Sequence, residues 1–186
     1  YHINSIDFDI EGGAIANTNA NHLRNVAIAE LEKSNPDLKV SFTLPVMPDG
    51  LTYNGIDLLK QAKADGVKID VVNIMAMDYG AGADSGDMGK DAINAAVSTI
   101  QQLKTIGLDA KVGITPMIGI NDVQSEVFTL QDAQELMAYA KDNPDIGSIG
   151  MWSIGRDNGH EVNVVSPVSS GISQSDYAFS SVFGLL

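Results

Sequence analysis

The chain has 186 residues, of which 24 are acidic and 11 are basic, so its formal net charge at pH 7 is −13. This balance lacks the basic surface of nucleic-acid-binding proteins and disfavours contact with anionic membranes, so we expect neither nucleic acid nor a membrane as a partner. The sequence contains no cysteine, which excludes disulfides and thiolate metal sites. No apolar run approaches the roughly 20 residues that a membrane-spanning helix needs.

Strand-like and helix-like segments alternate along the chain. Apolar and β-branched runs predict five strands, at residues 5–12, 38–47, 69–80, 110–120 and 146–155. Apolar residues at helical spacing, such as Leu23, Val26 and Leu31, indicate helices between and after these strands. Five helices are expected, at residues 16–36, 53–67, 88–107, 129–145 and 173–183. Thr129 is the expected N-cap of the fourth helix.

Five strand–helix units of roughly 37 residues each predict an α/β fold with a parallel sheet, in one domain over residues 1–186. Polar or glycine-rich loops follow the strands, as they do at the active-site face of a TIM (β/α)8-type barrel, and this favours a barrel over a doubly wound sheet. The alternative would place a nucleotide at "GAGADSG". Its Gly80, Gly82 and Gly86 do not have the GxGxxG spacing of a dinucleotide-binding loop.

The first predicted strand, "SIDFDIEGG", alternates acidic and apolar residues. Because successive side chains of a strand point to opposite faces, Asp7, Asp9 and Glu11 share one face, while the apolar residues share the other. On alternation alone, the acids could simply face water on a half-buried strand. Inside a barrel, three neighbouring carboxylates would repel one another as anions and hold at least one proton in the cluster.

This stretch closely resembles the DxxDxDxE signature of glycoside hydrolase family 18, the chitinases and their relatives, although Asn4 and Ser5 depart from its usual Asp-Gly. Further segments are similar to later strands of that family, in the same order. They are "NIMAMDYG", "GITPMIGIND" and "GSIGMWSIGRDN". The resemblance implies strands four to eight of a TIM-type barrel, without the first three βα units. We therefore expect either self-association or an upstream segment to complete the barrel.

The resemblance also implies a mechanism. Glu11 is expected to protonate the oxygen of the glycosidic bond, and the 2-acetamido group of the substrate then attacks the anomeric carbon in place of an enzyme nucleophile. Asp9 would orient that acetamide, and Asp7 would share the charge of the cluster. The expected substrates are chitin and N-acetylglucosamine oligomers, cleaved with retention of configuration, without a metal or cofactor. The family further suggests a secreted protein.

Other residues are implied to bind the sugar. Trp152 matches a tryptophan that forms the base of the subsite for the reacting sugar. The alternative interpretation is that Trp152 packs in the core of the barrel. Asp78 matches an aspartate that contacts this sugar, and Asn121 lies in the segment after the matching seventh strand. The peptide bond between Trp152 and Ser153 is expected to be cis.

Around Asp78 the sequence departs from the family. A tyrosine usually precedes this aspartate, whereas here Met77 precedes it and Tyr79 follows it. Either Tyr79 supplies the phenol from a shifted position, or this contact is missing. Met75 and Met117 are candidates for the walls of the pocket, and ordinary core packing is the equal alternative for both.

The remaining candidates point to no further site. His2, His22 and His160 are too scattered for a metal site or a catalytic dyad, and "DSGDMGKD" lacks the ligand spacing of a calcium loop. Three alternatives to a chitinase stay open. They are an endo-β-N-acetylglucosaminidase acting on N-glycans, a chitin-binding lectin, and an inactive, incomplete barrel.

Overall fold

A computed structural model describes residues 3–184, and its centre is a parallel β-sheet. The strands lie in the order β1-β2-β4-β5-β8. Their bounds are Ser5–Asp9 for β1, Lys39–Met47 for β2, Val71–Ala76 for β4, Lys111–Pro116 for β5 and Ile146–Ile149 for β8. All four pairings are parallel. The predicted α/β class and parallel sheet are therefore confirmed.

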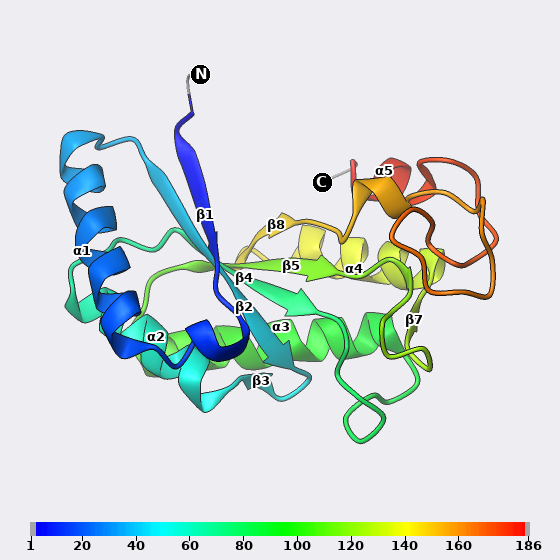
Figure 1. Cartoon of the computed structure of the whole chain (residues 1–186), viewed down its shortest axis with the longest axis horizontal. Coiled ribbons are helices and arrows are strands. Elements are labelled where there is room, and N and C mark those ends of the chain that lie inside the picture. Colours follow the sequence, from blue (N-terminus) through cyan, green and yellow to red (C-terminus); the bar gives the residue numbers. More distant parts are fainter. Residues whose placement is uncertain (1–2, 185–186) are drawn as a thin grey trace.

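The helices follow the strands along the chain, as Figure 1 shows. Their bounds are Thr18–Ser34 for α1, Tyr53–Ala64 for α2, Met88–Thr105 for α3, Leu130–Asp142 for α4 and Ala178–Phe183 for α5. Thr129 caps α4 as predicted, and it does so in a reciprocal pair with Asp132. No helix of the described part is both long and apolar enough to cross a membrane.

Short elements at the carboxyl ends of the strands were not predicted. Strand β3 (Gly50–Leu51) pairs antiparallel with β2, while β6 (Gly119–Ile120) and β7 (Val127–Phe128) form a small hairpin. Two single-turn 3₁₀ helices, Gly12–Ala14 and Ile154–Arg156, follow β1 and β8. The last predicted strand ends early, at Ile149, and only an isolated bridge from Trp152 to Met117 continues it.

The core lies between the sheet and its helices. Alternate residues of the central strands are fully buried there, including Phe42 and Leu44 of β2, Ile74 of β4 and Ile114 of β5. Because side chains alternate along a strand, the other face of the same strands carries a second set of residues, and several of these are polar. This second face corresponds to the interior of a barrel, and it holds the candidate site.

Helix α1 differs from its sequence pattern. Its apolar stripe faces outward, and the Leu23 side chain is 70% exposed, with Val26 and Leu31 exposed beside it. The buried face contains Asn21 and Asn25 together with Ile28 and Ala29. Asn25 donates a hydrogen bond to Asp65, and Asn21 donates one to the carbonyl of Ile15, so polar contacts with neighbouring segments set the rotation of this helix.

The sheet is open at both sides. Strand β1 pairs with β2 alone and β8 pairs with β5 alone within residues 3–184, so both are edge strands and the barrel is not closed. Unpaired strand edges present free N–H and C=O groups that can pair with another chain.

We predict that the 186-residue chain on its own associates, because both edges and the inner face of the sheet are uncovered. Multi-angle light scattering across a range of protein concentrations measures this. A constant monomer mass at every concentration would contradict the prediction.

Candidate active site

The three predicted acids lie on one face of the sheet. Along β1, Asp7 and Asp9 are exposed while Ile6 and Phe8 pack against the core, so the predicted alternation is confirmed. Beyond the strand the backbone stays extended at Glu11, which immediately precedes the 3₁₀ helix Gly12–Ala14. Glu11 is exposed on the acidic side, at the end of the strand where a barrel has its active-site face.

Asp7 ends a chain of polar side chains that crosses four neighbouring strands. Thr43 of β2 donates its hydroxyl to the Asp7 carboxylate at 2.8 Å, and it accepts from the Asn73 amide of β4 at 3.0 Å. Thr115 of β5 donates to the oxygen of Asn73 at 3.0 Å. Ser41 also donates to Asp7. The orientation of the Asp7 carboxylate is therefore fixed by the sheet itself.

Asp9 lies between the other two acids on this face. Burial raises the pKa of the Asp9 carboxyl above its usual value, and the charges of Glu11 and then Asp7 raise it further. Partial burial is the largest of these causes, and the like charges on the same face of the strand add to it. The folded chain therefore raises the affinity of the Asp9 carboxyl for a proton.

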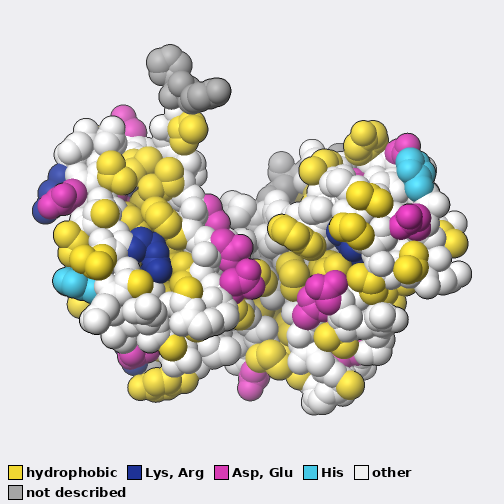
Figure 2. All heavy atoms as spheres, viewed as in Figure 1, with side chains coloured by type: hydrophobic (Ala, Val, Ile, Leu, Met, Phe, Trp, Pro, Cys, Tyr) yellow, Lys and Arg dark blue, Asp and Glu magenta, His cyan; other side chains and the backbone are white. Residues whose placement is uncertain are grey.

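A cleft of about 290 Å³ opens where the strands end. Its lining comes from four strands and the segments after them, namely Asp9, Glu11, Thr43, Met75, Met77, Asp78, Thr115, Met117, Asp122 and Trp152. A second hollow of about 250 Å³ shares Glu11, Met75, Met77 and Asp78 with it. In Figure 2, acidic side chains gather along the hollow between the two halves of the visible face. Seven of the ten predicted site residues therefore line this cleft, namely Asp9, Glu11, Met75, Met77, Asp78, Met117 and Trp152.

Trp152 is held by backbone contacts to the segment after β5. Its N–H donates to the carbonyl of Pro116 at 2.8 Å, and its own carbonyl accepts from the N–H of Ile118 at 3.0 Å. The Trp152 residue is 57% exposed, so it is not a core aromatic. The Trp152–Ser153 peptide bond is cis, as predicted.

Asp78 enters the cleft from a left-handed backbone conformation, with φ = 52°. One of its carboxylate oxygens accepts from the N–H of Val123 at 2.8 Å. Asn121 does not line the cleft. It is fully buried, donates to the carbonyls of Met117 and Gly119, and places its own oxygen 3.4 Å from the N–H of Asp78. Asn121 therefore supports the wall of the cleft, which corrects its prediction as a sugar contact.

The shifted-tyrosine alternative is also corrected. Tyr79 is only 5% exposed, packs into the core and is not among the residues that line the cleft. Burial raises the pKa of its phenol, and the nearby charges of Asp91 and Glu126 raise it further. The structure thus offers no Tyr79 hydroxyl to a ligand in the cleft. Of the methionines, Met75 and Met77 are half-buried in the cleft wall and Met117 is almost fully buried.

Sequence reasoning missed several residues of the site. Thr43, Asn73 and Thr115 are polar residues within otherwise apolar strands, and that placement was the available signal for them. Asp122 lines the cleft from the loop between β6 and β7. Glu126, at the end of the same loop, is fully buried and contacts the backbone after β4. Nothing in the local sequence distinguishes these two acids from the chain's other carboxylates.

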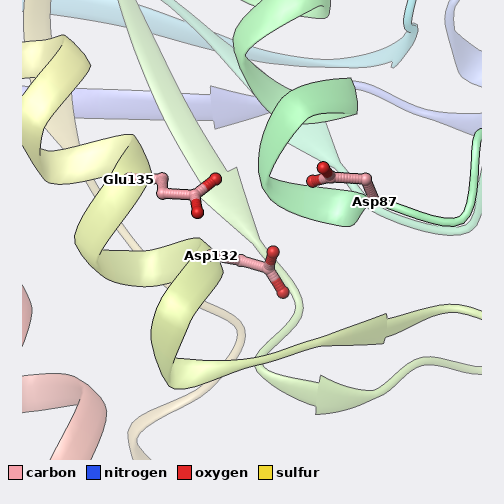
Figure 3. Close-up of side chains that lie close together, drawn as sticks. All are labelled: Asp87, Asp132 and Glu135. Carbon is pink, nitrogen blue, oxygen red and sulfur yellow. The ribbon is translucent and has the colours of Figure 1, made fainter.

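Away from the cleft, the carboxylates of Asp87, Asp132 and Glu135 lie within 4.8 Å of one another (Figure 3). Two of them have structural roles, because Asp87 caps α3 and Asp132 belongs to the capping pair of α4. The close approach of the two helices depends on Gly89, where an added Cβ would lie 2.9 Å from the backbone of Asp132. Helix capping thus accounts for Asp87 and Asp132, while Glu135 accepts a hydrogen bond from Gln131 on the same helix.

The two histidines within the described residues take no part in the site. His22 is exposed and contacts Asp65, and His160 is exposed and contacts Asp176. His2 lies outside the described residues.

Comparison with known proteins connects this geometry to an enzyme class. No family model matches the chain. A probable bifunctional chitinase/lysozyme of Escherichia coli K12 is 38% identical over 96% of this chain, and Endochitinase 11 of Metarhizium anisopliae is 39% identical over 82% of it. A crystal structure of the catalytic domain of a hyperthermophilic chitinase from Pyrococcus furiosus has a TM-score of 0.87 and 36% identity over the whole chain. The chain is similar in sequence and in fold to part of these chitinases. This confirms the resemblance predicted from the acidic motif and the assignment to a TIM-type α/β architecture.

The chain corresponds to only part of each relative. It spans 22% of the Escherichia coli protein, 32% of the Metarhizium protein and 61% of the Pyrococcus catalytic domain. Catalytic-site mutants of active domain 2 of a Pyrococcus furiosus chitinase have also been solved with chito-oligosaccharides, and that structure is 35% identical to this chain with a TM-score of 0.87.

We predict that Asp9→Asn stabilises the fold at neutral pH. The folded-state pKa of Asp9 is raised, so the stability contributed by its protonated form is complete below the unfolded pKa and is lost as the pH rises through the folded pKa. Asparagine removes the charge that causes this loss. Melting temperatures of the variant and the wild type should therefore differ at pH 7 and converge below about pH 4, near the ordinary Asp pKa. A gap that stays constant over this range would contradict the prediction.

Proposed function

We propose that this chain carries the acid/base residues of an enzyme that hydrolyses the β-1,4 linkages of chitin or N-acetylglucosamine oligomers. The observation that carries the proposal is the row of Asp7, Asp9 and Glu11 on one face of β1, ending in a cleft opposite an exposed Trp152. The sequence and fold similarity to chitinases supports it. We further propose, from family resemblance alone, that the enzyme is secreted.

Glu11 is the proposed acid and base. It borders both hollows, so a sugar chain lying across them would place a glycosidic bond beside its carboxyl group. The protonated Glu11 donates its proton to the leaving oxygen as that bond breaks. The resulting carboxylate then takes a proton from the incoming water, which completes the cycle and regenerates the acid.

The substrate supplies the nucleophile in the proposed reaction. The carbonyl oxygen of its 2-acetamido group attacks the anomeric carbon, forming a cyclic oxazolinium ion, and water then opens this ion with overall retention of configuration. Asp9 accepts a hydrogen bond from the acetamide N–H and balances the positive charge. Asp7, fixed by Ser41 and Thr43, provides a stationary negative charge behind Asp9.

The two hollows have different proposed roles. The hollow that includes Trp152 and Asp122 holds the sugar whose bond is cleaved, because an aromatic face suits the apolar face of a pyranose ring. Asp78 lies at the junction and can accept hydrogen bonds from sugar hydroxyls. The hollow that includes Pro45, Val46 and Met47 holds the leaving part of the chain.

We predict that Glu11→Gln abolishes hydrolysis and preserves oligomer binding. Glutamine keeps the shape of the side chain but has no transferable proton, a loss worth roughly 10²–10⁴-fold. Turnover of a fluorogenic N-acetylglucosamine oligomer and calorimetric binding of the same oligomer measure the two effects. Glu30→Gln, on the exposed face of α1, is the matched control. Residual activity within about tenfold of the wild type would exclude Glu11 as the acid.

Asp9→Asn should lower kcat more than it raises KM. The contact of Asp9 with the acetamide strengthens as positive charge develops, so its loss affects the transition state more than the bound substrate. Steady-state kinetics over a full range of substrate concentrations separates the two constants. A rise in KM at unchanged kcat would show that Asp9 only binds substrate.

A further inference from the structure

The backbone after β4 presents three consecutive N–H groups to one neighbouring loop. The N–H of Asp78 lies 3.4 Å from the side-chain oxygen of Asn121, and those of Tyr79 and Gly80 donate to the two carboxylate oxygens of Glu126 at 3.0 and 2.6 Å. Both Asp78 and Gly80 have positive φ, 52° and 82°. Successive N–H groups turned in this way form a concave anion-binding backbone, and here its anion is the side chain of Glu126.

Glu126 is the unusual partner in this arrangement. The residue is fully buried, and within the described chain no lysine, arginine or histidine forms an ion pair with it. Burial raises the pKa of its carboxyl, the two backbone N–H groups lower it, and the charges of Asp78 and Asp84 raise it. A buried carboxylate is costly unless its oxygens are hydrogen-bonded, and the loop after β4 satisfies that requirement.

The β6–β7 loop also donates a hydrogen bond to the segment after β4. Asp78 accepts a hydrogen bond from the N–H of Val123, which belongs to the same β6–β7 loop as Glu126. The loop is itself tied together, because the N–H of Asn121 donates to the carbonyl of Glu126 at 3.0 Å. Asp78 is therefore held from both its backbone and its side chain by one loop, in a conformation that non-glycine residues seldom adopt.

We propose that Glu126 is a positioning residue, which fixes the backbone after β4 so that the Asp78 carboxylate faces the sugar in the cleft. This inference rests on the proposed function of the cleft. Glu126 does not line the cleft, so it acts only through the loop that it holds. Displacement of a sugar-contacting group by about 1 Å can cost on the order of 10²-fold in rate, so the hold on Asp78 has a catalytic consequence.

The substitution that tests this is Glu126→Gln. The Tyr79 and Gly80 N–H groups donate to different oxygens of Glu126. A glutamine amide replaces one of these oxygens with an NH2 donor, which would face one of the two N–H groups and lose that hydrogen bond. Glu30→Gln makes the same chemical change on an exposed helix face and is the control. We expect the Tyr79 and Gly80 amides to exchange slowly with solvent deuterium in the wild type and in Glu30→Gln, and at least about tenfold faster in Glu126→Gln.

A double-mutant cycle with Asp78→Ala separates positioning from general destabilisation. Glu126→Gln alone should lower kcat/KM on an N-acetylglucosamine oligomer by about 10²-fold. In the Asp78→Ala background the same change should cost less than about threefold, since the group that it positions is already gone. The proposal would be overturned if the losses of kcat/KM in the two single variants multiplied in the double variant. It would also be overturned if Glu126→Gln were as active as Glu30→Gln.

Two results keep this inference distinct from the proposed function. If the wild-type protein neither binds nor cleaves the oligomer, the proposed function fails, while amide exchange still decides whether Glu126 holds the loop. If Glu126→Gln does not fold, the amide exchange rates of Tyr79 and Gly80 in the wild type test the positioning role. Fast exchange at Tyr79 and Gly80 in the wild type would overturn the positioning role.

Discussion

The candidate site depends on the parallel register between β1 and β2. Asp7 pairs with Ser41 and Asp9 pairs with Thr43, so each acid has a hydroxyl-bearing residue beside it on the next strand. The same alternation that sends Phe42 and Leu44 into the core turns Ser41 and Thr43 toward the acids. A shift of one residue would exchange the two faces, burying the polar set and exposing the apolar set. The stability of the core thus fixes the geometry of the acids.

The loops that follow the strands are held in position by buried polar side chains as well as by apolar packing. Besides Glu126, Arg156 is almost fully buried, and its guanidinium donates to the carbonyls of Ile118, Ile120 and Ser166. Asp157 accepts from the backbone N–H groups of Phe179 and Ser180 at the start of α5. Each of these side chains joins segments that are distant in the sequence. Loops built in this way have defined positions at the mouth of the sheet, which a binding cleft requires.

Much of the fold could be predicted from the sequence, because the strongest signals are periodic. The alternation in "SIDFDIEGG" and the apolar runs of the central strands reflect local strand geometry, so they predict the strands. The resemblance of the motifs to those of chitinases identified the acids and Trp152 as site residues. The rotation of α1 could not be predicted, since Asn25 is buried through its contact with Asp65, forty residues away. The sequence could not decide between the two alternatives for Tyr79 for a related reason. Its position depends on the left-handed turn at Asp78, which the β6–β7 loop maintains across more than forty residues of sequence.

The incomplete covering of Asp9 has a consequence for ligand binding. Its carboxyl already has a raised pKa, with burial as the main cause. A sugar ring seated in the cleft would remove more water from this group, which disfavours its charged form further. Binding and proton uptake would then be linked, each strengthening the other by the same factor. Under the proposed function, the protein would draw a proton from the buffer as its ligand arrives, and the heat of binding would vary with the ionisation enthalpy of that buffer. Asp9 would lose this proton again as the positive charge of the oxazolinium ion develops, because a nearby positive charge favours the carboxylate.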